Sequence, residues 1–256
     1  MKTKRLTIML VLFAIIVLMV VLSSTVFSLQ KVQLSFLEIP NTLSMSDASS
    51  ILETADFDYG TSVFLIDKAK YIDNLEKNNP KLKVIGIETR FPNELVVQVV
   101  EREEFCIIER INDYLVCDSD LKVLRIVDDI SLIDLPLVEN LGIDTSYLEL
   151  GDFASVCVNT YVFKNIEDAF WECYYERANV INLVKKFVFK EDGTLSIVTN
   201  FNFRIEIQYP TRDLSQKISC GLQSVFSDEG VGEDFVGLVK VIESNDSIVV
   251  YTIPNG

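Results

Sequence analysis

The sequence has no histidine, one tryptophan and only five cysteines in 256 residues. The absence of histidine removes the usual general base and the commonest metal ligand, and it excludes serine–histidine and cysteine–histidine nucleophile pairs. No two cysteines form a C-x-x-C pair, which excludes the common zinc spacings and a dense disulfide framework. No glycine-rich phosphate loop occurs either. We therefore expect no enzyme activity, no metal site and no cofactor.

The sequence does not decide whether two of the cysteines form a disulfide. Their odd number means that at least one is unpaired. Cys106 and Cys117 flank a predicted turn at Ile111-Asn112, so they face each other if the turn is tight. A disulfide between them and two buried free thiols are both compatible with the sequence.

Basic residues are also scarce, with 23 Lys and Arg against 38 Asp and Glu. Three of the cations, Lys2, Lys4 and Arg5, precede a hydrophobic run, so the remainder carries 20 − 38 = −18 charges. Such an acidic chain is a poor ligand for nucleic acid, and we expect protein partners, for example ones with basic segments. The simpler alternative is that the charge only keeps the chain soluble.

The hydrophobic run covers residues 6–27 and contains no charged residue. A helix of this length, at about 1.5 Å per residue, crosses a hydrocarbon core of about 30 Å. Because the cations precede it, we expect residues 1–5 in the cytoplasm, a transmembrane helix over 6–27 and the rest outside. The alternative is a cleavable signal peptide with small residues at 23–25, although its apolar core would be unusually long.

The next region, 32–102, is expected to be a β-α-α-β-β unit of an α+β fold with both helices on one face of the sheet. A strand at 32–39 has apolar residues at period two. A helix follows Ser46 as N-cap and carries an apolar stripe that includes Ile51 and Leu52, and a second helix follows Asp67 as N-cap. Two strands, at 82–89 and 95–101, flank a Pro-Asn turn.

Residues 103–253 are expected to form a larger, mainly antiparallel β domain with flanking helices, beginning near residues 101–104. The expected strands are 106–109, 114–117, 123–127, 186–189, 195–199 and 203–208, with helices at 165–177 and 213–226. A loop is expected around 135–138. A final hairpin pairs 237–242 with 247–253 around Asn245-Asp246.

Several motifs, in this order behind the hydrophobic run, resemble the FtsQ/DivIB family of bacterial cell-division proteins. GTSVFLID at 60–67 is similar to the family's G-x-n-l-f-x-i-d, and RFPNELVVQVVER at 90–102 to its r-x-P-x-x-L-x-i-x-v-x-E-R. Weaker matches are YLVCD at 114–118, LPLV at 135–138 and Lys217. The resemblance implies that the first unit is a POTRA domain (a small polypeptide-transport-associated fold).

The sequence also departs from the family pattern at three places. Glu103 follows the Glu-Arg pair where a proline is usual, and Pro40-Asn41 replaces an expected glycine. The late I-D-x-r motif is only Leu-Val-Lys-Val at 238–241. The C-terminal half therefore matches less well than the first.

The last strand is the candidate partner-binding site because a strand that ends the chain can lie at a sheet edge and accept another strand. Its candidate residues are Ile248, Val249, Val250, Tyr251 and Thr252. The family resemblance implies strand addition by division proteins of the FtsB/DivIC and FtsL type. An inert, covered edge is the alternative.

Arg212 and Lys217 are candidate cationic contacts beside that strand, with simple surface solvation as the alternative.

Together these features predict a non-enzymatic scaffold in the bacterial cell membrane, at the division septum, which recruits partner proteins and helps control septal wall synthesis. The alternative is a POTRA-bearing envelope protein used in protein transport or chaperoning. Uniform labelling of the envelope would favour transport, and labelling at midcell would favour division.

Overall fold

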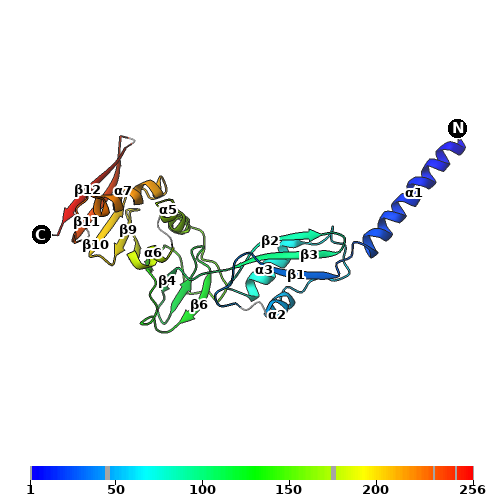
Figure 1. Ribbon diagram of the computed structural model, residues 1–256, viewed down its shortest axis with the longest axis horizontal. Helices are drawn as coiled ribbons and strands as arrows, with labels where there is room; N and C mark the ends of the chain where they lie inside the picture. The colour runs from blue at the N-terminus through cyan, green and yellow to red at the C-terminus, as the bar shows by residue number, and fades with distance from the viewer. Residues whose placement is uncertain (1, 44–46, 174–176, 233, 246, 256) are drawn as a thin grey trace. The chain divides into compact units, whose positions relative to one another are not determined.

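The computed structural model describes residues 2–43, 47–173, 177–232, 234–245 and 247–255 (Figure 1). The chain is an α+β protein that divides into two compact units, Met1–Arg102 and Glu103–Gly256. The first unit contains a three-stranded sheet, and the second is built on a sheet of nine strands.

The N-terminal helix α1 spans Lys2–Thr25. Its side chains are described at Met9–Val21 and at Thr25, where all are exposed. The side chains of residues 6–8 and 22–24, which belong to the predicted span, lie outside the described residues.

Searching the described part of the chain for a helix both long and apolar enough to cross a membrane finds none.

The first unit has the predicted β-α-α-β-β order. Its elements are β1 (Lys31–Phe36), α2 (Ala48–Glu53), α3 (Lys68–Asn78), β2 (Leu82–Arg90) and β3 (Glu94–Glu101). The central strand β3 runs parallel to β1 and antiparallel to β2. Ile51 of α2 and Leu75 of α3 join one core with Leu95, Val97 and Val99, which alternate along one face of β3.

The two predicted helix caps have different outcomes. Asp67 caps α3 as expected, since its carboxylate accepts a hydrogen bond from the Lys70 N–H at 3.3 Å. Ser46, the predicted cap of α2, lies outside the described residues. The cap position of α2 is Asp47, whose side chain makes no cap hydrogen bond.

Glu101 and Arg102, at the end of β3, each bind another segment of the first unit. Glu101 accepts backbone N–H bonds from Asn41, Thr42 and Leu43, which follow β1. Burial alone would raise the pKa of Glu101, but these bonds and that of the Thr42 hydroxyl together lower it. The buried Arg102 pairs with Glu76 of α3 at 3.0 Å and donates through Nε to the Leu82 carbonyl oxygen at 3.2 Å.

The second unit contains nine strands in the order β12-β11-β10-β9-β8-β7-β4-β5-β6. They are β4 (Cys106–Glu109), β5 (Tyr114–Cys117), β6 (Val123–Val127), β7 (Leu137–Glu139), β8 (Val184–Phe189), β9 (Leu195–Thr199), β10 (Phe203–Ile207), β11 (Gly237–Ser244) and β12 (Ser247–Pro254). Five neighbouring pairs are antiparallel, and β4·β7, β7·β8 and β10·β11 are parallel. The residues predicted to form a loop at 135–138 therefore include the start of a short central strand.

Four helices accompany this sheet: α4 (Val158–Lys164), α5 (Ile166–Glu172), α6 (Arg177–Leu183) and α7 (Leu214–Phe226). The helix predicted at 165–177 is α5 with the start of α6, and residues 174–176 lie outside the described part. Helix α4 was not predicted from the sequence. Its cap is Cys157, whose sulfur accepts from the Thr160 N–H at 3.5 Å.

Helix α7 covers the face of the sheet near β12 through a close approach at Gly221. A Cβ atom there would lie 2.9 Å from Cγ2 of Ile205 in β10 and 3.4 Å from Cγ2 of Val241 in β11. Glycine therefore lets the helix backbone approach the strands. Leu214, Ile218, Leu222 and Val225 supply the buried stripe of α7.

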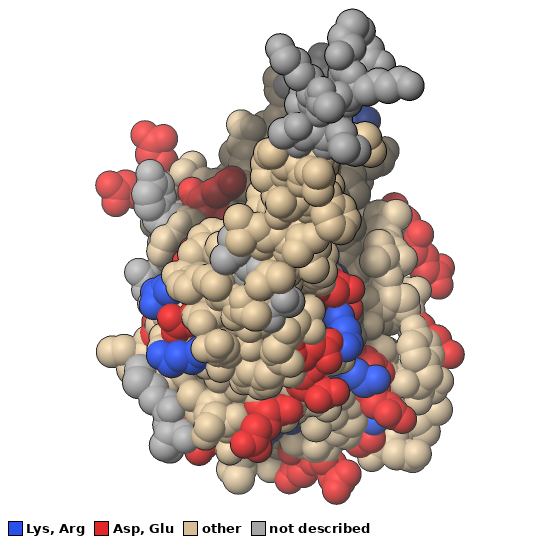
Figure 2. Space-filling model, turned by 90° about the vertical axis from the view of Figure 1, so that its right-hand side faces the viewer, with Lys and Arg blue, Asp and Glu red and all other residues tan. Residues whose placement is uncertain are grey.

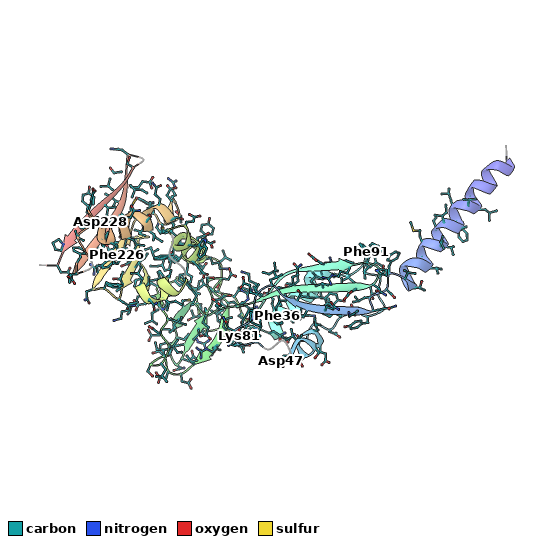
Figure 3. All side chains as sticks on the ribbon, viewed as in Figure 1. Phe36, Asp47, Lys81, Phe91, Phe226 and Asp228 are labelled. Carbon is teal, nitrogen blue, oxygen red and sulfur yellow. The ribbon has the colours of Figure 1, made fainter. Side chains whose placement is uncertain are left out.

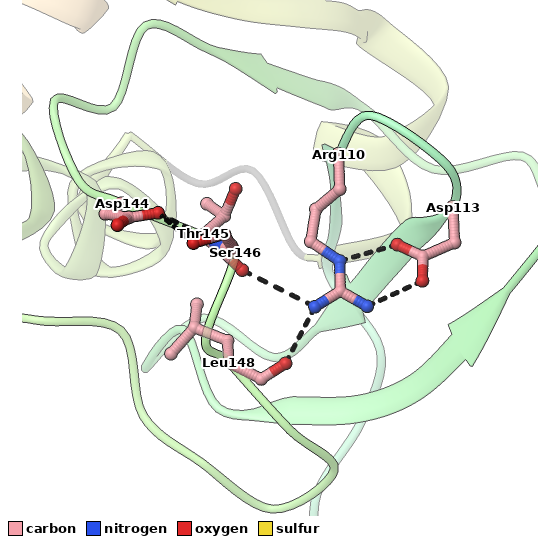
Figure 4. Close-up of polar contacts among 6 residues, drawn as sticks. All are labelled: Arg110, Asp113, Asp144, Thr145, Ser146 and Leu148. Carbon is pink, nitrogen blue, oxygen red and sulfur yellow. Dashed lines mark hydrogen bonds and ion pairs between the residues drawn. The ribbon is translucent and has the colours of Figure 1, made fainter.

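Two further features secure the β6 side of the sheet. Val123 donates its N–H to the Asp152 carbonyl oxygen and accepts from the Gly151 N–H, both at 2.9 Å. Arg110 holds the loop that leads there (Figure 4): it forms a two-point ion pair with Asp113 at 2.5 and 2.6 Å and donates to the Leu148 carbonyl oxygen at 2.8 Å. Residues 151–154 thus lie beside the start of β6 and the two residues before it.

Candidate partner-binding site

Strand β12 lies at one end of the nine-stranded sheet, and all five predicted binding residues of the last strand belong to it. Among the described residues its strand neighbour is β11 alone. The two strands are antiparallel, with Val241 opposite Val250 and Gly237 opposite Pro254. The predicted final hairpin is confirmed, although Asp246 in its turn lies outside the described residues.

A hydrogen bond just beyond the strand fixes which β12 amides face β11. Asn255 donates its N–H to the Val236 carbonyl oxygen at 3.0 Å. Backbone groups of an antiparallel pair point alternately toward and away from the partner, so Val249, Tyr251 and Ile253 bond toward β11. Gln208 donates to the Val241 carbonyl oxygen at 3.1 Å, so the backbone C=O of Val241 points toward β10 and away from β12. This agrees with the alternation, because Val241 lies opposite Val250, whose backbone groups point away from β11.

The free side of β12 consequently presents the backbone N–H and C=O groups of Ile248, Val250 and Thr252. Pro254 falls in the same phase and has no N–H, so it ends this row of donors. Ile248 and Val250 also pack partly against the core of the unit. Tyr251 is 50% exposed and Ile253 is 47% exposed, so both offer apolar surface next to the free backbone.

Lys217 is placed differently from a surface cation because its side chain is fully buried. Its Nζ donates to the carbonyl oxygens of Gln208 and Tyr209 at 3.2 and 3.0 Å and pairs with Glu243 of β11 at 3.3 Å. One ammonium group thus joins α7, the segment after β10 and the end of β11. Lys217 positions the hairpin that carries β12 and offers no charge at the surface.

Arg212, by contrast, is exposed and lines a surface pocket at the start of α7. The other residues of that pocket are Tyr209, Thr211, Glu243 and Asn245. Because Glu243 and Asn245 belong to the β11–β12 hairpin, the pocket lies beside the start of β12. The structure therefore brings Arg212 near the free strand edge, as a candidate contact for a carboxylate.

Glu243 was not identified from the sequence, although its position carried a signal. It continues the series Val239, Val241, Glu243 along β11, in which the first two side chains are buried. An acid on the inward phase of a strand requires a partner. Lys217 likewise lies on the apolar stripe of α7, between Leu214 and Ile218, so the pair was recognisable as a buried cation and its counterion.

The acidic residues and the cysteines are the other groups that could carry chemistry. No three His, Cys, Asp or Glu residues in the described part of the chain gather as metal ligands. None of the five cysteines, all of which are described, forms a disulfide, although Cys106 and Cys117 lie directly opposite each other on β4 and β5. What the geometry offers is a strand edge with a supporting ion pair, and such an edge is suited to binding.

Comparison with known protein families gives a match in the first unit. Residues 37–102 match the family model of the POTRA domain, FtsQ-type. The match covers α2, α3, β2 and β3 and ends on the Glu101-Arg102 pair. No curated protein matches the chain.

Proposed function

Residues 37–102 are an FtsQ-type POTRA domain, which supports an FtsQ/DivIB-like family for the chain, and on this premise we propose a non-enzymatic scaffold of bacterial cell division. In this proposal the second unit binds single-pass coiled-coil division proteins of the FtsB/DivIC and FtsL type. By gathering them at the septum, the scaffold helps to control septal wall synthesis.

The observation that carries the proposal is the free side of β12. Three outward backbone N–H groups, at Ile248, Val250 and Thr252, match the spacing that an added strand requires. The exposed Tyr251 and Ile253 supply apolar contacts for the side chains of the incoming strand. Arg212 adds a cation for an acidic residue of the partner, and the ion pair of the buried Lys217 with the partly exposed Glu243 holds the edge in place.

The proposal places the acidic bulk of the chain outside the cytoplasm, with α1 as its single-pass tether at the division septum. The support for this part is the uncharged run 6–27 behind Lys2, Lys4 and Arg5, since the more cationic side of such a run normally stays in the cytoplasm. Separation of cell membranes before and after carbonate extraction tests it. Full release of the chain by carbonate would contradict the tether.

Binding of the full chain in detergent to candidate coiled-coil partners tests the edge. Val250→Pro removes an outward donor without removing a bond to β11, and we expect affinity to fall about tenfold or more. Val250→Thr keeps the N–H and the β-branched shape, so it is the matched control and should bind like the parent chain. Equal binding by the proline variant and the parent would contradict strand addition.

Two further measurements complete the test. Thermal unfolding and circular dichroism of Val250→Pro must match those of the parent, because Val250 packs partly on the core. A fluorescent fusion should concentrate at midcell. Uniform labelling of the envelope would contradict the division role and favour the transport alternative.

A further inference from the structure

The POTRA unit exposes an aromatic cluster immediately after α1. Phe27, Phe64 and Phe91 contact one another, with ring centroids 5.2 Å apart for Phe27 and Phe64, 5.6 Å for Phe64 and Phe91, and 6.3 Å for Phe27 and Phe91. Phe64, Leu65 and Phe91 are 60%, 79% and 65% exposed. We call Phe27, Phe64, Leu65 and Phe91 the aromatic foot.

We propose that the aromatic foot rests in the lipid bilayer at the boundary between headgroups and acyl chains, so that the POTRA unit is docked on the membrane surface. This inference rests on the proposed role of α1 as a membrane tether. It goes beyond that role because it assigns a second, separate membrane contact to the folded domain.

Backbone hydrogen bonds fix the foot to the segment that leaves α1. Val63 donates to the Phe27 carbonyl oxygen at 2.8 Å, and Leu29 donates to the Thr61 carbonyl oxygen at 2.8 Å. Gln30 donates to the carbonyl oxygen of Asn93, in the β2–β3 turn, at 3.0 Å. The loop with Phe64 and Leu65 and the turn with Phe91 are therefore both attached to residues 27–30, and Phe27 also packs on the domain core.

Distance along the chain identifies lipid as the occupant. Phe27 is two residues beyond Thr25, the last residue of α1, so at most about 7 Å of chain separates them. The headgroup layer on each side of a bilayer is about 5–7 Å thick. A foot attached within that reach of a membrane helix lies in the interfacial layer, where Phe and Leu side chains insert at the boundary between headgroups and acyl chains.

The foot lies on the side of the POTRA unit that α1 leaves. Figure 2 looks onto the side of the molecule where α1 lies and shows a central area without charged side chains, much of it α1 itself, with acidic and basic side chains at its margins. Phe91 lies at the end of the POTRA unit nearest to α1 (Figure 3). Leaving such large apolar side chains in water is unfavourable, and insertion at the acyl-chain boundary removes that cost.

Depth-dependent quenching of single tryptophans tests the proposal with the full chain in phosphatidylcholine vesicles. Trp171, the only native tryptophan, is first replaced by phenylalanine. Phe64→Trp and Phe91→Trp then report on the foot, and Met19→Trp reports on α1. Ile85→Trp is the matched control, since Ile85 is 51% exposed but lies on β2 five residues before Arg90, about 17 Å along the strand.

Lipids brominated on their acyl chains should lower the emission of Phe64→Trp and Phe91→Trp by about half, because interfacial side chains lie about 5–10 Å deep. Met19→Trp should be quenched more strongly, and Ile85→Trp should not be quenched. Quenching at position 19 without quenching at 64 and 91 would overturn the foot and leave the tether intact. No quenching at position 19 would overturn both, and equal quenching at 85 would overturn a localised foot.

Discussion

The two edge strands of the nine-stranded sheet, β6 and β12, differ in what lies on their outer sides. At one edge, residues 151–154 of the same chain lie beside the start of β6 and the two residues before it, and both the N–H and the C=O of Val123 are bonded to that segment. At the other, the outward groups of β12 have no further strand beside them among the described residues. An exposed strand edge is a liability for aggregation, so a chain that covers one edge and leaves the other open has a use for the open one.

Proline substitution should affect the two edges very differently. Val123→Pro removes a made hydrogen bond and alters a fully buried side chain, so we expect a loss of about 3 kcal/mol in the free energy of unfolding. Thr252→Pro removes an N–H that faces away from β11 and an exposed side chain, so the loss should stay below about 1 kcal/mol. Chemical denaturation of the two variants measures both values.

The matched control for this pair is Tyr251→Pro, one residue away but with its N–H directed at β11. It should destabilise the hairpin more than Thr252→Pro does. If the substitutions at 251 and 252 were equally harmful, the assigned phase of the β12 amides would be wrong.

Removal of the buried cation should loosen the open edge. Lys217→Met leaves Glu243 and the carbonyl oxygens of Gln208 and Tyr209 without their shared donor, and we expect the unfolding free energy to fall by about 2–3 kcal/mol. Amide exchange in β11 and β12 should accelerate more than that in β4 and β5. Unchanged stability would show that the pair does not hold the hairpin.

Acid should weaken the attachment of the loop near the covered edge. Hydrogen bonds from Arg110 hold the pKa of Asp113 below its ordinary value. The stability from this pair is therefore complete above the unfolded pKa of about 4 and is lost as pH falls through the lower, folded value. Unfolding measured from about pH 5 to 3 should show a steeper loss for the parent than for Asp113→Asn. An identical slope in the two chains would contradict this assignment.

The smallest effect is expected at Arg212. Arg212→Ala removes an exposed side chain, so the unfolding free energy should change by less than about 0.5 kcal/mol. Its partner affinity should fall by about threefold at low salt and less at high salt, because a contact at the rim of an interface is screened. Arg212→Lys is the control that retains the charge. A large loss of stability in Arg212→Ala would show a structural role instead.

Much of the fold was predictable because its strands follow from local sequence patterns. The strands at 106–109, 114–117 and 123–127 have their predicted bounds, since short apolar runs are separated there by turn residues. The motif at 90–102 was informative for a physical reason, because Glu101 and Arg102 each bind a different element of the POTRA unit. The family match covers the same residues.

What could not be predicted depends on long-range partners. Strand β7 has three residues and owes its conformation to parallel pairing with β4 and β8, far away in the sequence. The position of Lys217 on the apolar stripe of α7 indicated burial, but its carbonyl acceptors come from the segment after β10, so these contacts could not be predicted from the helix alone. The aromatic foot joins Phe27, Phe64 and Phe91 from three separate segments, and no single window of the sequence contains it.

Amide hydrogen exchange along β12, with and without a coiled-coil division partner, tests the open edge most directly. In the free chain, Val249, Tyr251 and Ile253 should be protected by β11, while Ile248, Val250 and Thr252 exchange rapidly. Addition of the partner should slow the second set and leave the first little changed. Rapid exchange at 248, 250 and 252 in a saturated complex would contradict strand addition at β12.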